Sequence, residues 1–188
     1  MKTYISMLRG INVGGQKKIL MTDLKILYEE IGLRKVRTYI QSGNVIFCSD
    51  NEIPSLVIAK KIQDTITKKY NFNVAVIIRS IDKMQEIISS NPFLKEKSIN
   101  TEKLYITFIA DSPNKLNSEI LSKVEFSPDR FIINGKEIYL HCANGYGKTK
   151  LSNIFFEKKL KMIATTRNWK TVNTLLKLAS EQIKTEIS

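Results

Sequence analysis

The chain has 188 residues, 43% of them hydrophobic, and a formal net charge of +12. This length suits one larger domain or two small ones, and the hydrophobic fraction excludes a disordered chain. The positive charge favours a nucleic acid or an anionic small molecule as partner, but a lysine-rich composition with solvated faces gives the same value.

No apolar run approaches the roughly 20 residues of a membrane span. Lys2 is followed by one strand-length apolar run, which is not a signal-peptide pattern. We therefore expect a cytoplasmic protein with no membrane partner. Cys48 and Cys142 lack metal-ligand spacing, and His141 beside Cys142 on a strand points to the opposite face. We expect two free thiols, no metal and no cofactor; no oligomeric state follows from the sequence.

Apolar periodicity and turn signals predict the elements of the first half. They are a strand over 3–8, a helix over 21–31, hairpin strands over 35–40 and 45–48, a helix over 55–69 and a strand over 74–78. The order strand, helix, hairpin, helix, strand is that of a ferredoxin-like β-α-β-β-α-β unit.

The second half nearly repeats this order. Its predicted elements are a linker helix over 81–90, a strand over 104–110, a helix over 112–124, a hairpin over 130–142, and helices over 151–160 and 169–182. Asn134-Gly135 is the strongest hairpin signal. We predict an α+β fold of tandem ferredoxin-like units over 1–80 and 81–188. The second unit should end in extra helices in place of a last strand.

Residues 9–18 (RGINVGGQKK) connect the first strand to the first helix and contain three glycines and three cations. Successive N–H groups in a glycine-rich turn can form an anion-binding concavity, and neighbouring cations add charge. The predicted ligand-binding residues of this loop are Arg9, Asn12, Gly14, Gly15 and Lys17. The alternative is a basic surface loop that binds nothing.

The first hairpin carries hydroxyl and amide groups around its turn. Tyr39, Gln41, Ser42 and Asn44 suit hydrogen-bonded recognition of a ligand, and they also suit an ordinary turn. We include these four residues in the predicted ligand-binding set.

A second glycine-rich loop, residues 144–150, lies between a strand and a helix. Its Gly-Lys-Thr fails the P-loop pattern, because Cys142 stands where that pattern needs a glycine. The loop could still hold an anion at a helix N-terminus. Its predicted ligand-binding residues are Gly145, Gly147, Lys148 and Lys150.

A third cluster precedes the last helix. Arg167 opposes the dipole of that helix, which hints at a bound anion, whereas Asn168 suits either capping or ligand contact. His141 is the only histidine, and no paired carboxylates occur in a cleft-like context. Hydrolase chemistry is therefore not indicated, and the catalytic residues, if there are any, are unknown.

Five segments resemble, in order, the signature segments of bacterial domain-of-unknown-function family 1697. They are residues 8–15 (LRGINVGG), 37–45 (RTYIQSGNV), 91–93 (NPF), 145–147 (GYG) and 164–169 (ATTRNW). The resemblance covers nearly the whole chain and implies two ferredoxin-like halves. Thr149 stands where the family usually has serine. The family brings no activity that would carry over.

Two functions follow from these patterns. The first is a site for an anionic, phosphate-containing small molecule in a cleft between the halves. There the cations, Asn12 and Arg167 would hold the anion, by electrostatic stabilisation rather than covalent chemistry. The second is a nucleic-acid-binding module that uses the basic surface. A structural or protein-partner role is the third reading, which the polar loops do not suggest.

Overall fold

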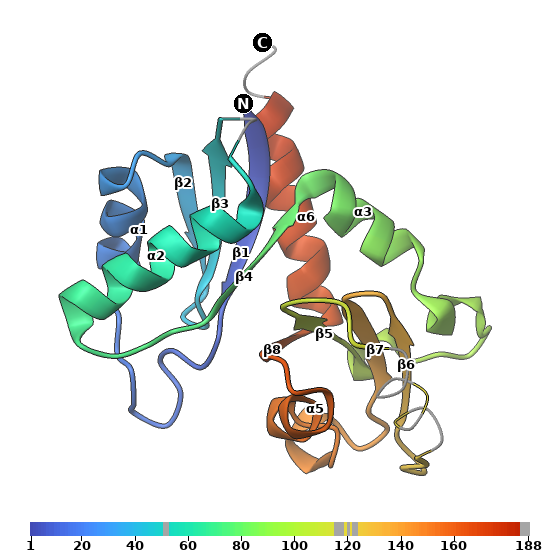
Figure 1. The fold of residues 1–188 in the computed structure, drawn as a ribbon. Helices are drawn as coiled ribbons and strands as arrows, with labels where there is room; N and C mark the ends of the chain where they lie inside the picture. The colour runs from blue at the N-terminus through green and yellow to red at the C-terminus, as the bar shows by residue number, and fades with distance from the viewer. Residues whose placement is uncertain (51–52, 115–118, 120, 122–123, 185–188) are drawn as a thin grey trace. The chain divides into compact units, whose positions relative to one another are not determined.

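Figure 1 shows the computed structural model, which describes residues 1–50, 53–114, 119, 121 and 124–184. The chain forms two compact units. The first comprises Met1–Glu86 and the end of helix α6 (Trp169–Lys184) from Thr174 on, and the second comprises Ile87–Asn173. Each unit contains a four-stranded antiparallel sheet, and five α-helices lie within the described residues. The fold is therefore α+β, as predicted.

The first unit has the strand order β2-β3-β1-β4. Its elements are β1 (Lys2–Leu8), α1 (Met21–Glu30), β2 (Arg34–Tyr39), β3 (Asn44–Ser49), α2 (Ser55–Tyr70) and β4 (Val76–Ser80). These match the predicted strands and helices of the first half within about two residues, which is the usual uncertainty of element ends. Asn71 ends α2 in the left-handed conformation at φ 59°.

The core of the first unit contains side chains from the sheet and from helices α1 and α2. The helices contribute residues three or four apart, and the strands contribute alternate residues, because those positions share a face. This core includes Leu24, Leu27 and Tyr28 of α1, Ile58, Ile62 and Ile66 of α2, and Tyr4, Leu8, Val45 and Phe47 of the strands.

The second unit has the corresponding order β6-β7-β5-β8. Its elements are β5 (Leu104–Ile109), β6 (Arg130–Asn134), β7 (Glu137–His141), α5 (Asn153–Leu160) and β8 (Ala164–Asn168). Helix α3 (Ile81–Ser89) precedes them and runs from the first unit into the second. Short 3-10 helices occupy Pro92–Lys95, Thr101–Lys103 and Tyr146–Lys148. The repeated strand order agrees with an internal duplication.

One prediction for the second unit is wrong. We expected helices in place of a last strand, but Ala164–Asn168 forms β8, which pairs antiparallel with β5 through contacts such as Thr107↔Thr166. This segment has one apolar residue in five, so periodicity does not reveal it; pairing with its neighbour makes it a strand. Most of the predicted helix over 112–124 lies outside the described residues.

Across the described part of the chain, none of the helices combines the length and the apolar character needed to cross a bilayer.

Candidate functional site

The loop after β1 and the turn between β2 and β3 lie at the same end of the first unit's sheet (Figure 1). The strand register requires this, because Met7 at the end of β1 pairs with Asn44 at the start of β3. Leu8 likewise pairs with Val76 at the start of β4. We call the surface formed by residues 9–23, 39–44 and 68–75 the loop end of the first unit.

Asn12 fastens the first glycine-rich loop to the hairpin turn. Its Nδ2 donates hydrogen bonds of 2.9 Å to the carbonyl oxygens of Ile19 and Gln41, and its Oδ1 accepts one of 2.9 Å from the Ile19 amide. The residue lies in the left-handed region at φ 55°, which asparagine tolerates better than most residues. Asn12, predicted to contact a ligand, therefore uses its amide to hold two segments together.

The tip of the loop is a tight turn over residues 13–16. The Gln16 amide donates to the Val13 carbonyl at 3.1 Å, and the central residues Gly14 and Gly15 have φ values of 59° and 76°. Two positive φ values define a type I′ turn, which explains the glycine pair. Within the described residues, no protein acceptor engages the amides of these exposed glycines. The turn therefore presents backbone donors to solvent.

The hairpin turn packs tightly against the same loop. A Cβ atom added to Gly43 would lie 2.7 Å from Ile11 Cδ1 and 2.8 Å from Leu8 Cβ, so only glycine fits there. Buried Asn44 donates from Nδ2 to Ser42 Oγ at 2.9 Å, which orders the turn from inside. Ile40 is 49% exposed and has φ 51°, a conformation that costs a side-chain-bearing residue about 1–2 kcal/mol.

The loop end is strongly basic. Its sequence contains five cations against one carboxylate, a local charge of +4: Arg9, Lys17, Lys18, Lys68 and Lys69 against Asp23. A charge of this density attracts anions within about a Debye length, roughly 10 Å at 0.1 M salt.

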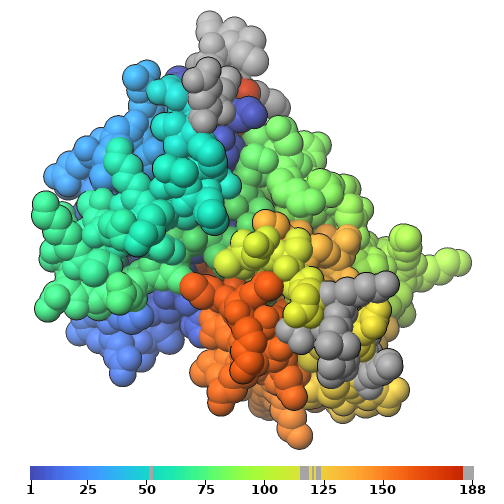
Figure 2. Space-filling view, viewed as in Figure 1, coloured from blue at the N-terminus to red at the C-terminus, as the bar shows by residue number. Residues whose placement is uncertain are grey.

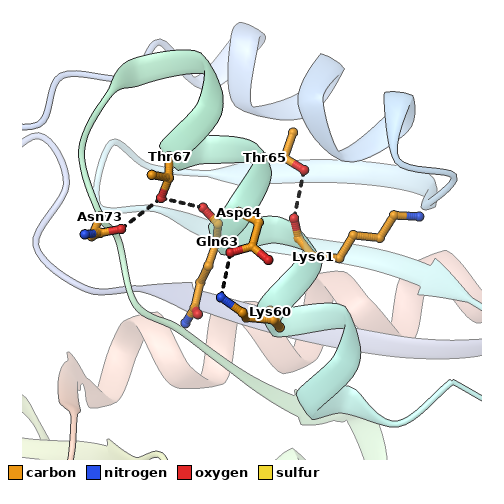
Figure 3. Close-up of polar contacts among 7 residues, drawn as sticks. All are labelled: Lys60, Lys61, Gln63, Asp64, Thr65, Thr67 and Asn73. Carbon is orange, nitrogen blue, oxygen red and sulfur yellow. Dashed lines mark hydrogen bonds and ion pairs between the residues drawn. The ribbon is translucent and has the colours of Figure 1, made fainter.

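Lys17 is held in place by the connection between α2 and β4. Its Nζ donates to the Asn73 carbonyl at 2.7 Å. Figure 3 shows how Asn73 is in turn linked to the end of α2, where Thr67 Oγ1 lies 3.0 Å from Asn73 Oδ1 and 2.9 Å from the Gln63 carbonyl oxygen. Together with the bond from Asn12 to the Gln41 carbonyl, these bonds join three segments that are distant in the sequence into one surface.

The second glycine-rich loop lies in the second unit and is held by its tyrosine. The Tyr146 hydroxyl donates to Thr166 Oγ1 at 3.1 Å and accepts from the Asn153 amide at 3.2 Å. Ser152 Oγ accepts from the Phe155 amide at 3.2 Å, and so caps α5. Because two amides of the first turn of α5 already have protein acceptors, this helix terminus is less open to an anion than the sequence suggested.

Other predicted residues of this loop lie at its surface. Gly147, Lys148 and Lys150 are exposed, and half-buried Gly145 has φ 85°. Thr149 donates from Oγ1 to the Asp129 carboxylate at 2.5 Å and accepts from the Leu151 amide at 3.1 Å. The Thr149 hydroxyl thus fixes the conformation of the loop through these two hydrogen bonds.

Asn168 caps a helix, whereas the Arg167 side chain is buried against the sheet. The Asn168 side chain caps α6 by accepting from the Thr171 amide at 2.7 Å, which confirms the capping interpretation. Arg167 is 8% exposed and donates from Nη1 to Thr165 Oγ1 at 2.8 Å and to the Thr166 carbonyl at 2.9 Å. Strand alternation puts its side chain on the sheet face opposite Thr166, and therefore opposite the Tyr146 hydroxyl.

A second buried arginine was left outside the predicted ligand-binding set. Arg79 is the fourth residue of β4, as Arg167 is of β8, and each is 8% exposed. Each donates from Nη1 to the carbonyl of the preceding residue, at 3.0 and 2.9 Å. The following residues, Ser80 and Asn168, both cap a helix. Aligning the two halves beyond their hairpins would have revealed this repeated arginine-cap pair.

The second unit also has an apolar hollow of about 430 Å³ that no sequence pattern indicated. Its lining includes Phe93, Phe126 and Phe131, together with Asp129 and Arg130. Arg130 makes two hydrogen bonds of 2.9 Å to Glu96, and these bonds lower the pKa of that carboxyl group. Phe93 and Glu96 are distant in the sequence from residues 126–131 and meet them only in the folded unit.

Two reactive side chains of the second unit have pKa values that burial shifts. Burial raises the pKa of the Cys142 thiol to about 11, so it is not a ready nucleophile. Burial also lowers the pKa of His141, with the Arg130 charge adding to the effect. Within residues that the structure describes, no group of three or more histidine, cysteine, aspartate and glutamate side chains is arranged to hold a metal ion.

Comparison with known proteins supports the resemblance noted from the sequence. A solved structure titled "The structure of conserved bacterial protein SP0830 from Streptococcus pneumoniae" matches with a TM-score of 0.73 at 22% identity, over 95% of this chain and 98% of that one. At this identity the likeness concerns the fold alone. No curated protein matches the chain. The model of the family described as "Protein of unknown function (DUF1697)" matches residues 1–139, well over half of the chain, and the chain therefore belongs to this family.

Proposed function

We propose that the loop end of the first unit binds an anionic small molecule that carries a phosphate group. One observation carries this proposal: Asn12 joins two segments that were predicted separately, the glycine-rich loop and the hairpin turn, into a surface with a local charge of +4. A surface already held by hydrogen bonds loses little conformational entropy when a ligand binds, which favours affinity.

Different residues of the loop end would contact different parts of the ligand. Arg9, Lys17 and Lys18 would balance the charge of the phosphate, and the amides of Gly14 and Gly15 would donate hydrogen bonds to its oxygens. Tyr39, Gln41 and Ser42 would contact the rest of the molecule. Lys148, Lys150 and Arg167 are kept as proposed anion contacts within the second unit. Should a reaction occur, electrostatic stabilisation of developing charge is the contribution that these groups can make.

Nucleic acid is the second candidate, and the distribution of aromatic side chains argues against its commonest mode. Single strands are usually held by stacking bases on exposed aromatic rings. Every aromatic side chain lies within the described residues, and none of them is exposed. A nucleic acid would therefore bind mainly through phosphate contacts, which carry no sequence information.

A thermal-shift screen tests the small-molecule proposal. Inorganic phosphate, nucleotides and phosphorylated sugars are added separately, and a ligand present at 100 times its Kd should stabilise the protein by about 2.7 kcal/mol. Arg9→Gln and Lys18→Gln should reduce the shift. Lys158→Gln, an exposed lysine on α5, serves as the matched control and should respond as the parent does.

Two results would reject the proposal. One is that no phosphate compound raises the melting temperature. The other is that the two loop variants and the α5 control respond alike, because the shift would then come from general screening of a basic protein. Fluorescence anisotropy with a labelled RNA oligonucleotide, measured over a range of salt concentrations, tests the nucleic-acid alternative.

We also propose that both units are ferredoxin-like and that the protein is cytoplasmic. The order of strands and helices in the first unit supports the first point, since it runs β-α-β-β-α-β. The two free, buried cysteines are in keeping with a reducing compartment.

A further inference from the structure

We infer that the phosphate group bound at the loop end belongs to the headgroup of an anionic lipid, so that this end of the first unit docks on a lipid surface. The inference rests on the proposed function and names the class of its ligand. It starts from three exposed aliphatic side chains among the cations of the loop end: Val13 (64% exposed), Leu20 (68%) and Ile40 (49%).

Each of these three residues is next in sequence to Asn12 or to a residue that Asn12 binds. Val13 follows Asn12 directly, Leu20 follows Ile19, and Ile40 precedes Gln41; the Asn12 side chain is hydrogen-bonded to the last two neighbours. Val13 is thus joined to Asn12 by a peptide bond, and Leu20 and Ile40 are each next to a residue that makes hydrogen bonds of 2.9 Å with the Asn12 side chain. Figure 1 draws the loop and the turn as connections at the end of the sheet, and in Figure 2 blue residues of the N-terminal part of the chain lie at the molecular surface.

Ile40 gives an independent reason to assign a role to this apolar cluster. A β-branched residue in the left-handed region is strained, and glycine or asparagine would remove the strain. Burial of the side chain does not compensate, because half of it is exposed. Strain that the folded state does not need is concentrated at binding surfaces.

The chemistry of the cluster selects a lipid surface over other partners. Protein interfaces are depleted in lysine and enriched in aromatic residues, whereas this surface combines lysines with aliphatic tips. Single-stranded nucleic acids are usually held by stacking on exposed aromatic rings, and the described aromatic side chains are all at least partly buried. An anionic membrane surface attracts lysine and arginine, while aliphatic side chains enter the boundary between headgroups and acyl chains.

Docking of this kind needs no spanning helix, so it is compatible with the absence of one among the described residues. It differs from our sequence-based expectation that no membrane is involved, which no observation contradicts. That expectation rested on the length of apolar runs, which reports spanning segments and says nothing of short exposed loops.

Vesicle co-sedimentation of the full chain tests the inference. We expect binding to vesicles of phosphatidylcholine mixed with phosphatidylglycerol, weak binding to phosphatidylcholine alone, and loss of binding in high salt. Leu20→Ser should weaken binding about tenfold, which corresponds to about 1.4 kcal/mol. Leu20 is the N-cap of α1, where serine is favoured, so this variant should fold normally.

Leu56→Ser is the matched control. Leu56 is 75% exposed near the start of α2 and lies outside the residues that define the loop end, so it should not contribute. Ile40→Asn supplies a second measurement: it should raise the melting temperature by relieving strain and also weaken vesicle binding. Loss of binding with gain of stability is a result that general damage to the fold does not produce.

Each alternative outcome is decisive. Equal binding to neutral and anionic vesicles, or equal losses in Leu20→Ser and Leu56→Ser, overturns the lipid inference. If soluble glycerol phosphate raises the melting temperature while anionic vesicles do not bind, the proposed anion site stands and its lipid source is wrong. If no phosphate compound raises the melting temperature and anionic vesicles do not bind, both proposals fail. Binding of an RNA oligonucleotide that the aliphatic variants leave unchanged would instead favour nucleic acid.

Discussion

Replacing Asn12 tests how the loop end is held together. The side chain makes three hydrogen bonds, and the backbone has a positive φ. Asn12→Gly removes the hydrogen bonds but adopts the positive φ without strain. Asn12→Ala removes the same hydrogen bonds and also strains the backbone, because alanine disfavours a positive φ. Comparing the two variants therefore separates the two contributions.

The structure sets the expected magnitudes. A typical hydrogen bond contributes about 1 kcal/mol net, and less where it is exposed to solvent, as the bond to the Gln41 carbonyl is. We expect Asn12→Gly to lower the free energy of unfolding by about 2 kcal/mol. Alanine should cost about 1–2 kcal/mol more, the usual penalty for the left-handed region.

Urea denaturation followed by far-ultraviolet circular dichroism measures these changes, with the slope checked for two-state behaviour. Asn71→Gly is the matched control, because Asn71 has a similar φ of 59° and makes no side-chain hydrogen bond within the described residues. It should change stability little. If Asn12→Gly is as stable as the parent, the hydrogen bonds do not hold the loop; if glycine and alanine are equivalent, the backbone argument is wrong.

Two further predictions concern the turn and the pH dependence. Gly43→Ala should destabilise the protein more than Gly14→Ala in the same urea assay. Both positions have a positive φ, but only at Gly43 would the added Cβ lie within 3 Å of neighbouring atoms. Equal losses of unfolding free energy would contradict the packing at Gly43. Burial lowers the pKa of His141 below its ordinary value of 6.5, so the unfolded state binds a proton that the folded state resists. Stability should therefore fall as the pH drops below about 6.5, and His141→Gln should show a smaller fall; identical pH profiles would assign the effect to other groups.

Most of the fold could be predicted from local patterns. The glycine-rich loop, the Asn-Gly turn and the periodicity of α2 each report short-range physics: left-handed backbone, tight turns and one apolar helix face. These signals place the strands and helices, and the similarity of the two hairpins indicates the duplication. They also drew attention to the loop and the hairpin turn that meet at the loop end.

What only the tertiary structure decided is how those residues are used. Asn12 was predicted to contact a ligand, which stays a prediction, and the structure shows that its side chain holds Ile19 and the Gln41 backbone. The segment that became β8 has too few apolar residues to be seen as a strand until β5 pairs with it. Gly43 is needed because Ile11 and Leu8 approach it. Each of these depends on contacts between distant segments, and local sequence carries little information about which segments will meet.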